Sequence, residues 1–339
     1  MKHRVRAMGC DTLRPLNAAP IASLRTPGRA CPLRWSYPAT IFASAPVRRA
    51  EVLYVAGGLY GNVHALEAIS ALAARETQPV TIAFNGDFHW FDIDDESFER
   101  IDRGVAAHCA LAGNVEVALA GDDEGIGCGC AYPPEVAPET VERSNRIHAR
   151  LRQTALRFPA LLARLARLPM HALFEVGRLR IAVVHGDAGN LAGWRFDRQA
   201  LDDPGQADWL RAVFRDSLVD VFASSHTCAP VFRIFDTRGG ERAVINNGAA
   251  GMPNFAATRH GLITRIAASR APVAAVYGAE LSTVRIEAIP VEYDAPAWER
   301  AFLADWPAGT PAHESYWQRI LRGPDLEPVC AAPRRIALG

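Results

Sequence analysis

Lysine is almost absent from this chain, and so are the features that would place it in several common classes. Lys2 is the only lysine among 339 residues. No run approaches the roughly 18 consecutive apolar residues that a membrane-spanning helix requires, so no membrane partner is expected. The seven cysteines show no framework spacing and the N-terminal segment has no apolar core, which excludes a secretory signal and predicts reduced thiols in a cytoplasmic protein.

Acidic residues are scarce only near the N-terminus. Residues 1–50 contain Lys2 and eight arginines but a single acid, Asp11, so the other 289 residues hold 28 basic and 36 acidic side chains, a net charge of about −8. Nucleic-acid binding needs clustered Arg or Lys, so the acidic body argues against such a partner. We predict that residues 1–33 are a disordered basic tail and that residues 34–339 form a single domain. A transit peptide and an early start codon remain open for the tail.

Short apolar runs alternate with amphipathic segments in the first half of the chain. The alternating segments comprise expected strands at residues 51–57, 79–84 and 109–112 and expected helices at residues 62–75 and 96–107. Asn62 is the predicted N-cap of the first helix. Residues 121–134 are too rich in Gly and Pro for regular structure, and leucines at helical spacing predict two helices within residues 139–168. We therefore expect a helical insertion at about residues 121–168.

The second half of the chain is mostly strand. The expected strands cover residues 171–176, 179–185, 219–224, 231–235, 243–246, 261–266, 273–277 and 283–290. Helices are expected at residues 208–214 and 298–322. Alternating strands and helices followed by a run of strands are typical of an α/β protein with two packed sheets and helices outside.

Polar side chains directly follow four of the predicted strands. They stand in the segments Asn85-Gly86-Asp87, Gly113-Asn114, His185-Gly186-Asp187 and Ser225-His226-Thr227-Cys228. Because α/β proteins build their sites at the carboxyl ends of strands, we expect these groups to converge. A carboxylate, an amide oxygen and two imidazoles would together form a cage suited to Zn, Mn or Fe.

The first strand leads into a glycine turn, residues 57–62, that contains no carboxylate and no histidine. The glycines at 57, 58 and 61 are compatible with the phosphate loop of a nucleotide-binding protein. However, the full Gly-x-Gly-x-x-Gly pattern and the acid ~20 residues further on are missing, so this hypothesis has little support.

Five blocks of the sequence, taken in order, resemble the signature of the calcineurin-like metallophosphoesterase superfamily. That signature is Asp-x-His, Gly-Asp, Gly-Asn-His-Asp/Glu, a strand-end His, and Gly-His-x-His. The corresponding blocks here are Gly58-Leu59-Tyr60-Gly61-Asn62, Gly86-Asp87, Gly113-Asn114-Val115-Glu116, His185-Gly186 and Ser225-His226-Thr227-Cys228. The resemblance spans residues 51–254 and implies a four-layer α-β-β-α sandwich of two mixed sheets flanked by helices.

The departures from that signature sort by metal site. In the family, one ion is held at the positions that are Gly58, Tyr60, Asp87 and Cys228 here, so three of its four ligands are lost or altered. The other ion is held at the positions of Asp87, Asn114, His185 and His226, and all four are present. The third block of the family also contains a histidine that assists the reaction, and its position is occupied by Val115 here. The resemblance therefore implies a remodelled centre with one divalent ion, Mn, Zn or Fe, although two are compatible with it.

Catalytic groups that compensate for the missing ligands are expected at Tyr60, His89 and Cys228. Tyr60 could donate a hydrogen bond to a substrate oxygen, although a packed aromatic ring is equally consistent with its position. His89, with Asp92 close behind it, could face the site or stack on Trp90.

The cysteines offer a second way to rebuild the altered metal site. Cys228 could join Cys128 or Cys130 in a sulfur-rich metal site or a redox pair, since thiolates bind zinc. Packing of small buried residues is the slightly favoured interpretation, because Cys-x-Cys is not a complete metal motif.

The resemblance implies a metal-dependent phosphoesterase that hydrolyses a small phosphomonoester, phosphodiester or nucleotide. Asn62 and Asn247 are the expected substrate contacts, and the helices within residues 139–168 could form a lid that selects the substrate. Glu116 and Arg143 are interpreted as solvent-facing charges. The alternative is a non-catalytic module that keeps the fold and binds an ion or a ligand.

Overall fold

The computed structural model describes residues 26–121 and 125–338, and their strands form two mixed sheets. The six-stranded sheet has the order β11 (Tyr277–Leu281), β12 (Val284–Val291), β10 (Gly261–Ala267), β2 (Val52–Ala56), β3 (Val80–Asn85) and β4 (Cys109–Leu111). The seven-stranded sheet has the order β1 (Val47–Arg49), β5 (His171–Val176), β6 (Leu179–Val184), β7 (Val221–Ser224), β9 (Gly240–Asn246), β8 (Val231–Thr237) and β13 (Arg334–Ala337). Parallel pairs join β2, β3 and β4 at one end of the six-stranded sheet and β6, β7 and β9 in the middle of the seven-stranded sheet.

The two sheets pack face to face because their strands divide apolar side chains between two cores. In β2, Leu53 and Val55 point into the core between the sheets, where Ile181 of the seven-stranded sheet joins them. Val52 and Tyr54 of the same strand point the other way, into a core shared with helices. Successive side chains of a strand face opposite sides of its sheet, so a continuous apolar run is buried on both faces.

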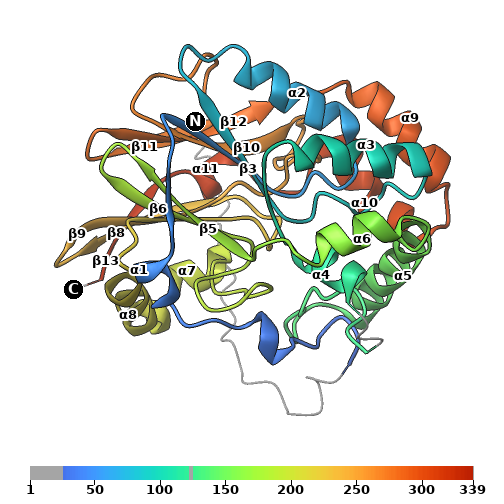
Figure 1. Ribbon diagram of the computed structural model, residues 1–339, viewed down its shortest axis with the longest axis horizontal. Helices are drawn as coiled ribbons and strands as arrows, with labels where there is room; N and C mark the ends of the chain where they lie inside the picture. Colours follow the sequence, from blue (N-terminus) through green and yellow to red (C-terminus); the bar gives the residue numbers. More distant parts are fainter. Residues whose placement is uncertain (1–25, 122–124, 339) are drawn as a thin grey trace, which may run out of the picture.

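Helices cover the outer face of each sheet (Figure 1). The helices on the six-stranded sheet are α2 (Val63–Ala73), α3 (Asp95–Ala106) and α9 (Ala295–Asp305). Those on the seven-stranded sheet are α1 (Ile41–Ser44), α7 (Arg198–Asp202) and α8 (Ala207–Ser217). Asn62 caps α2, as predicted. The four-layer α-β-β-α sandwich of two mixed sheets is therefore confirmed.

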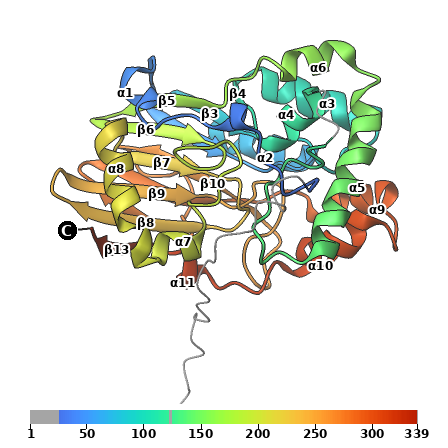
Figure 2. The ribbon, with the colours of Figure 1, turned by 90° about the horizontal axis from the view of Figure 1, so that it is seen from below.

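A group of helices closes one end of the sandwich. These helices are α4 (Asn114–Ala120), α5 (Pro138–Ala155), α6 (Pro159–Leu165) and α10 (Pro311–Arg322). Figure 2 shows α5 and α10 side by side there, and the two helices are in contact. Ile147 and Leu151 of α5 and Leu165 of α6 are buried in the core that α2 and α3 share. The helices predicted within residues 139–168 are thus present, and they are integral to the core.

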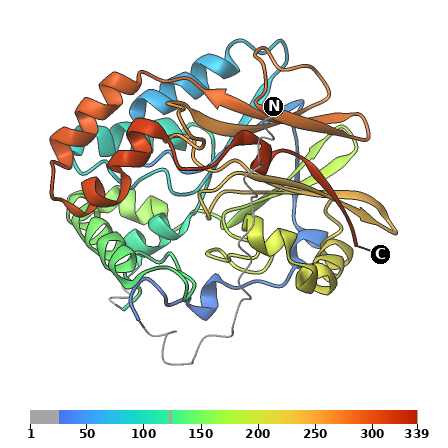
Figure 3. The same ribbon diagram turned by 180° about the vertical axis from the view of Figure 1, so that it is seen from behind.

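Both ends of the described chain pack onto the domain. Ordered contacts begin before residue 34, because Arg29 donates to the backbone carbonyls of Tyr132, Pro133 and Val136. Residues 1–25 of the predicted tail lie outside the described residues. At the other end, α11 (Pro328–Ala331) leads into β13, which joins β8 at the edge of the seven-stranded sheet (Figure 3).

Four expectations about the chain need correction. The strand predicted at residues 273–277 is β11, Tyr277–Leu281, because pairing of Leu281 with Val284 sets the register of its hairpin with β12. The single helix expected at residues 298–322 is two helices, α9 and α10, and the short α4 was not predicted, since one or two turns give little periodic signal. Cys330 is disulfide-bonded, whereas the other described cysteines are free thiols, as expected. Within the described ranges, no helix has the length and apolar character needed to cross a bilayer.

Candidate metal centre

Ends of strands from both sheets meet at one place. β3 ends at Asn85, β6 at Val184 and β7 at Ser224, so Asp87, His185 and His226 each follow within two residues. Gly86 makes this approach possible. Its φ is 76°, and a Cβ there would lie 2.4 Å from the Gly113 backbone and 2.8 Å from His185 Nδ1.

The four predicted ligands converge. Three ligand atoms surround His185 Nε2: Asp87 Oδ1 at 3.4 Å, Asn114 Oδ1 at 3.0 Å and His226 Nδ1 at 3.2 Å. The ligand atoms of Asp87, His185 and His226 all lie within 4.8 Å of one another, and these side chains are buried. Among the described residues, this is the only group of three or more His, Cys, Asp and Glu side chains with metal-binding geometry.

Backbone carbonyls orient three of these ligands. His185 Nδ1 donates to Asn85 O at 2.8 Å, and His226 Nε2 donates to Cys130 O at 3.1 Å. Asn114 Nδ2 donates to Cys128 O at 3.0 Å. These bonds use the single N–H of each neutral imidazole and turn the amide nitrogen outward, so the atoms that face one another are hydrogen-bond acceptors. Two nitrogen and two oxygen acceptors fit a borderline divalent ion such as Zn, Mn or Fe.

Burial and neighbouring charges shift the pKa values of Asp87, His185 and His226. Burial opposes ionisation of Asp87, but His185, His226 and the Val115 N–H together favour it, and the pKa of the Asp87 carboxyl is lowered. Burial likewise opposes protonation of His185, but the Asp87 carboxylate more than offsets it, and the pKa of His185 is raised. Burial and the neighbouring His185 lower the pKa of His226 to about 3. His226 is therefore neutral near pH 7, the state in which an imidazole binds a metal.

A buried carboxylate holds the loop that carries Asp87. Glu116 is 0% exposed, which corrects its interpretation as a solvent-facing charge. Its Oε2 accepts from the backbone N–H of Asp87 at 2.8 Å and of Gly113 at 2.9 Å, and its Oε1 accepts from that of Phe88 at 3.1 Å. Burial and the nearby Asp87 carboxylate raise the pKa of Glu116. Glu116 thus joins the two loops that present Asp87 and Asn114.

The three altered positions form one cluster beside the ligands. The Tyr60 ring folds over Gly58, where a Cβ would lie 2.6 Å from Tyr60 Cε2, so no aspartate fits at position 58 with this ring in place. The Tyr60 hydroxyl contacts Cys228 Sγ at 2.5 Å. Tyr60 and Cys228 both have a φ of 54°, which side chains of their kind rarely adopt. The surrounding fold therefore holds both residues in a strained conformation.

The cysteines do not assemble a sulfur-rich site. Burial raises the pKa of the Cys228 thiol and of the Cys130 thiol. Protonated thiols are poor nucleophiles and poor metal ligands. No cysteine belongs to a metal-binding group in the described part of the chain. Cys128 and Cys130 instead contribute the backbone carbonyls that orient Asn114 and His226.

His89 lies behind the site rather than in it. Its side chain is fully buried, and its Nδ1 is 2.6 Å from Asp92 Oδ2. The ring stacks on Phe98, with 4.1 Å between ring centroids, and not on Trp90 as the sequence suggested. Because His89 is absent from the cavity wall, this placement gives no support to a catalytic role.

Asn62 and Asn247 also lie away from the cavity wall. Asn62 caps α2 with its side-chain oxygen and donates through Nδ2 to Gly251 O at 3.0 Å. Asn247 donates to Leu262 O at 3.0 Å. Both amides are buried and brace loops around the site, so the structure places neither where a substrate would touch it.

A cavity of about 180 Å³, the metal-centre cavity, opens beside the ligands. Its wall includes Asp87, Asn114 and His226, and the other side chains that matter below are Tyr60, Trp90, Tyr132, Trp194, Tyr316 and Arg319. No residue of α5 or α6 lines it, so the cavity gives no support to the predicted lid. Arg143 of α5 donates instead to Ser315 Oγ at 2.7 Å, which corrects its reading as a solvent-facing charge.

Sequence reasoning missed the aromatic and cationic part of this wall. Trp194 donates its indole N–H to Cys130 O at 3.0 Å, the carbonyl that also orients His226. Tyr132, Trp194 and Arg319 come from separate segments of the chain, and none stands in a recognisable motif. No local signal in the sequence could have brought them together.

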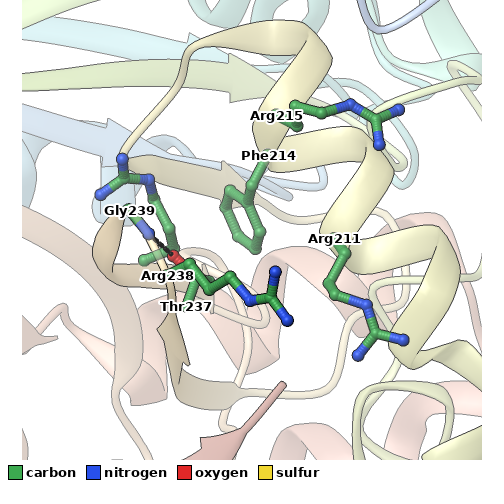
Figure 4. A pocket seen from close by; sticks show the side chains of 7 residues that line it. Arg211, Phe214, Arg215, Thr237, Arg238 and Gly239 are labelled. Carbon is green, nitrogen blue, oxygen red and sulfur yellow. Dashed lines mark hydrogen bonds between the residues drawn. The ribbon is translucent and has the colours of Figure 1, made fainter. Parts of the chain in front are cut away.

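A larger cavity, of about 680 Å³, lies elsewhere, between α8 and the turn that joins β8 to β9. We call it the arginine cavity. It is lined by Arg211, Phe214, Arg215, Thr237, Arg238, Gly239 and Arg242. Figure 4 shows the Phe214 ring between side chains of the helix and of the turn. Arg211 pairs with Asp208 and Arg215 with Asp216. This cavity holds no residue of the metal centre.

Comparison with known proteins establishes the fold and goes no further. No family model matches the chain, and no curated protein matches it. A metallophosphoesterase structure from Sphaerobacter thermophilus is 19% identical, covers 80% of this chain and 100% of its own, and has a TM-score of 0.51. A hypothetical protein from Pyrococcus horikoshii OT3 is 17% identical, covers 81% of this chain and 99% of its own, and has a TM-score of 0.53. The chain therefore has the metallophosphoesterase fold.

Proposed function

We propose that this protein is a metal-dependent phosphoesterase with one divalent ion held by Asp87, Asn114, His185 and His226. The observation that carries the proposal is the convergence of three candidate ligand atoms, Asp87 Oδ1, Asn114 Oδ1 and His226 Nδ1, around His185 Nε2. When His185 is neutral, these four atoms are all acceptors that repel one another, and a cation relieves that repulsion. Mn, Zn and Fe are the candidate ions.

The residues of the chain prepare the site for a phosphate ester. A bound divalent ion supplies Lewis-acid polarisation of a phosphoryl oxygen and lowers the pKa of water. Asp87 contributes the one negative charge among the ligands, and His185 and His226 are kept in the tautomers that leave a lone pair facing the centre. Glu116 anchors the Asp87 loop by accepting from the backbone N–H groups of Asp87 and Phe88.

The cavity favours a small phosphomonoester. Its volume of about 180 Å³ is below the about 300–1,000 Å³ of pockets that enclose drug-sized ligands. Trp90, Tyr132 and Trp194 provide an aromatic wall for a planar or apolar alcohol group. A small soluble substrate, with neither nucleic acid nor membrane as partner, and a cytoplasmic location remain parts of this proposal.

Tyr60 and Cys228 are the proposed catalytic contacts that line the cavity. Burial, with Cys228 next in effect, raises the pKa of Tyr60 well above its ordinary value, so its hydroxyl stays protonated and acts as a donor. Cys228 Sγ donates to His226 O at 3.3 Å, which leaves the sulfur free to accept from Tyr60. Any donation from Tyr60 to a substrate oxygen has to replace this contact.

Metal content and ester hydrolysis test the proposal together. We expect protein purified without added metal to contain one ion per chain, or to bind one Mn²⁺ by calorimetry. The loaded protein should cleave p-nitrophenyl phosphate, whose leaving group needs little protonation, faster than bis(p-nitrophenyl) phosphate or a nucleoside monophosphate. A protein that binds none of Mn²⁺, Zn²⁺ and Fe²⁺ would refute the metal centre.

The second candidate function is a non-catalytic module with the same ion. It is favoured by Val115 in the cavity wall, because an aliphatic side chain at that place offers no proton to a leaving group. This hypothesis predicts stoichiometric metal binding without cleavage of any ester tested. The ester screen on metal-loaded protein therefore separates the two functions.

A further inference from the structure

Arg319 is the only lysine or arginine in the wall of the metal-centre cavity. It lies in the last turn of α10, a helix that none of the ligand-bearing loops belongs to. Its charge is felt by Tyr60 and Cys228, since it opposes the rise in pKa of both groups. The guanidinium therefore stands on the side of the cavity formed by the altered positions.

The hydrogen bonds of Arg319 leave its charge uncompensated. Nε donates to Pro253 O at 3.1 Å, and Nη2 donates to Cys228 O at 3.0 Å and to Asn254 Oδ1 at 3.4 Å. All three acceptors are neutral. Within residues 26–121 and 125–338, no carboxylate pairs with Arg319 and no acceptor is recorded for Nη1. A guanidinium with a free edge is suited to an oxyanion.

The two buried arginines of the described chain, Arg265 and Arg233, are both paired. Arg265 is 0% exposed and contacts the carboxylates of Glu76 at 2.6 Å and Glu287 at 2.9 Å. Arg233 is 3% exposed and contacts that of Asp202 at 2.6 Å. A desolvated charge is costly unless it is paired, which explains both arrangements. Arg319 is half-buried in the wall of the metal-centre cavity, and no described carboxylate pairs with it.

We infer that Arg319 binds a phosphoryl oxygen of the substrate and supplies a second positive charge beside the ion. The inference rests on the proposed function and names the residue that completes it. A phosphomonoester is close to a dianion near pH 7. Only one metal-binding group is present among the described residues. The ion would therefore face the phosphate dianion from one side of the small cavity, and Arg319 would face it from another.

Inorganic phosphate is the probe that tests this inference without any turnover. Calorimetric titration of phosphate into Mn²⁺-loaded protein should show affinity about 10- to 100-fold weaker for Arg319→Gln than for the wild type, the range expected on loss of a charged hydrogen-bond donor. Arg319→Lys, which keeps the charge but loses the bidentate fork, should recover part of this loss. Mn²⁺ affinity should be the same in all three proteins.

Arg322→Gln is the matched control. Arg322 lies three residues further along α10 and is exposed, and it is absent from the cavity wall. It should leave phosphate affinity within about twofold of the wild type.

Two results would overturn the inference. One is phosphate affinity unchanged in a folded Arg319→Gln protein, which would mean that phosphate contacts the ion alone. The other is a parallel loss of melting temperature and Mn²⁺ affinity in Arg319→Gln and in Arg319→Lys, which would make Arg319 a brace for the segments of Cys228 and Pro253. Absence of esterase activity in the wild type would count against the proposed function but would leave the phosphate titration valid.

Discussion

The two cavities described above differ in how their charged side chains are partnered. The arginine cavity is the larger, about 680 Å³ against about 180 Å³, and it holds four guanidinium groups where the metal-centre cavity holds one. Three of its arginines pair with nearby carboxylates: Arg211 with Asp208, Arg215 with Asp216 and Arg242 with Asp220. In the metal-centre cavity, four acceptors face one another and Arg319 pairs with no described carboxylate.

This difference shows that size and charge count do not identify a site. Exposed ion pairs are solvated and each contributes only about 0–1 kcal/mol, so a group of them forms on many surfaces without a ligand. Buried polar atoms without complementary partners cost several kcal/mol, and a fold retains them where a ligand completes the set. The smaller cavity is therefore the better candidate for chemistry.

The comparison predicts the largest effect at Asp87. Asp87→Asn removes the one carboxylate among the ligands while keeping a residue type that tolerates the φ of 51° at this position. We expect Mn²⁺ affinity to fall at least about 100-fold and phosphoesterase activity to fall at least about 1,000-fold. Calorimetry and an ester assay on the same preparation measure both.

Asp208→Asn is the control for Asp87→Asn, because it removes an exposed carboxylate that pairs with Arg211 of the arginine cavity. It should change neither metal affinity nor activity by more than about twofold. Equal effects of the two substitutions would remove the distinction between the cavities.

A smaller effect is expected from His148, a buried residue of α5 whose ring lies 6.5 Å from that of Trp90 in the cavity wall. Burial, followed by the charge of Arg152, lowers the pKa of His148 to about 4. The pKa of His148 in the folded protein is thus below its ordinary value of 6.5. The neutral imidazole therefore contributes free energy of unfolding that is fully present above about pH 6.5 and is lost as the pH falls toward about 4.

His148→Gln should remove that part of the acid sensitivity. Between about pH 7 and about pH 4.5, the free energy of unfolding should fall by about 2–3 kcal/mol more in the wild type than in His148→Gln. Urea denaturation at both pH values measures the difference. Identical pH profiles would mean that His148 titrates normally in the folded protein.

The smallest effect is predicted for the arginine cavity itself. The double substitution Arg211→Gln, Arg215→Gln should leave phosphate affinity and esterase activity of the Mn²⁺-loaded protein within about twofold of the wild type, since these guanidinium groups are exposed and paired. A loss of phosphate binding equal to that of Arg319→Gln would show that the larger cavity is the anion site.

The sequence predicts the fold and the convergence of the four candidate ligands because both depend on local patterns. Each buried strand is an apolar run, and each of Asp87, His185 and His226 stands within two residues of the end of one. The order of the blocks then implied which strand ends meet. The structure gives no support to the roles predicted for Asn62, Asn247 and His89, because polar residues near a site also serve as caps and braces for its loops.

Glu116 and Arg319 show why the remaining part of the site was out of reach. A glutamate after Asn114 has the same local pattern whether it faces water or accepts from backbone N–H groups of another loop. An arginine in an amphipathic C-terminal helix gives no sign that its side chain reaches Cys228, 91 residues away in the chain. Only contacts between distant segments distinguish these alternatives.

The turn that carries Gly58 and Tyr60 separates the two sources of information most clearly. The sequence by itself determined that this strand-to-helix turn lacks a carboxylate and an imidazole, and that one set of four ligands is nevertheless complete. Tertiary structure alone decided that the Tyr60 ring occupies the space above Gly58 and contacts Cys228, and that Arg319 approaches from α10. Which residues are present is a property of the chain, whereas which atoms share a cavity depends on the packing of segments that are distant in sequence.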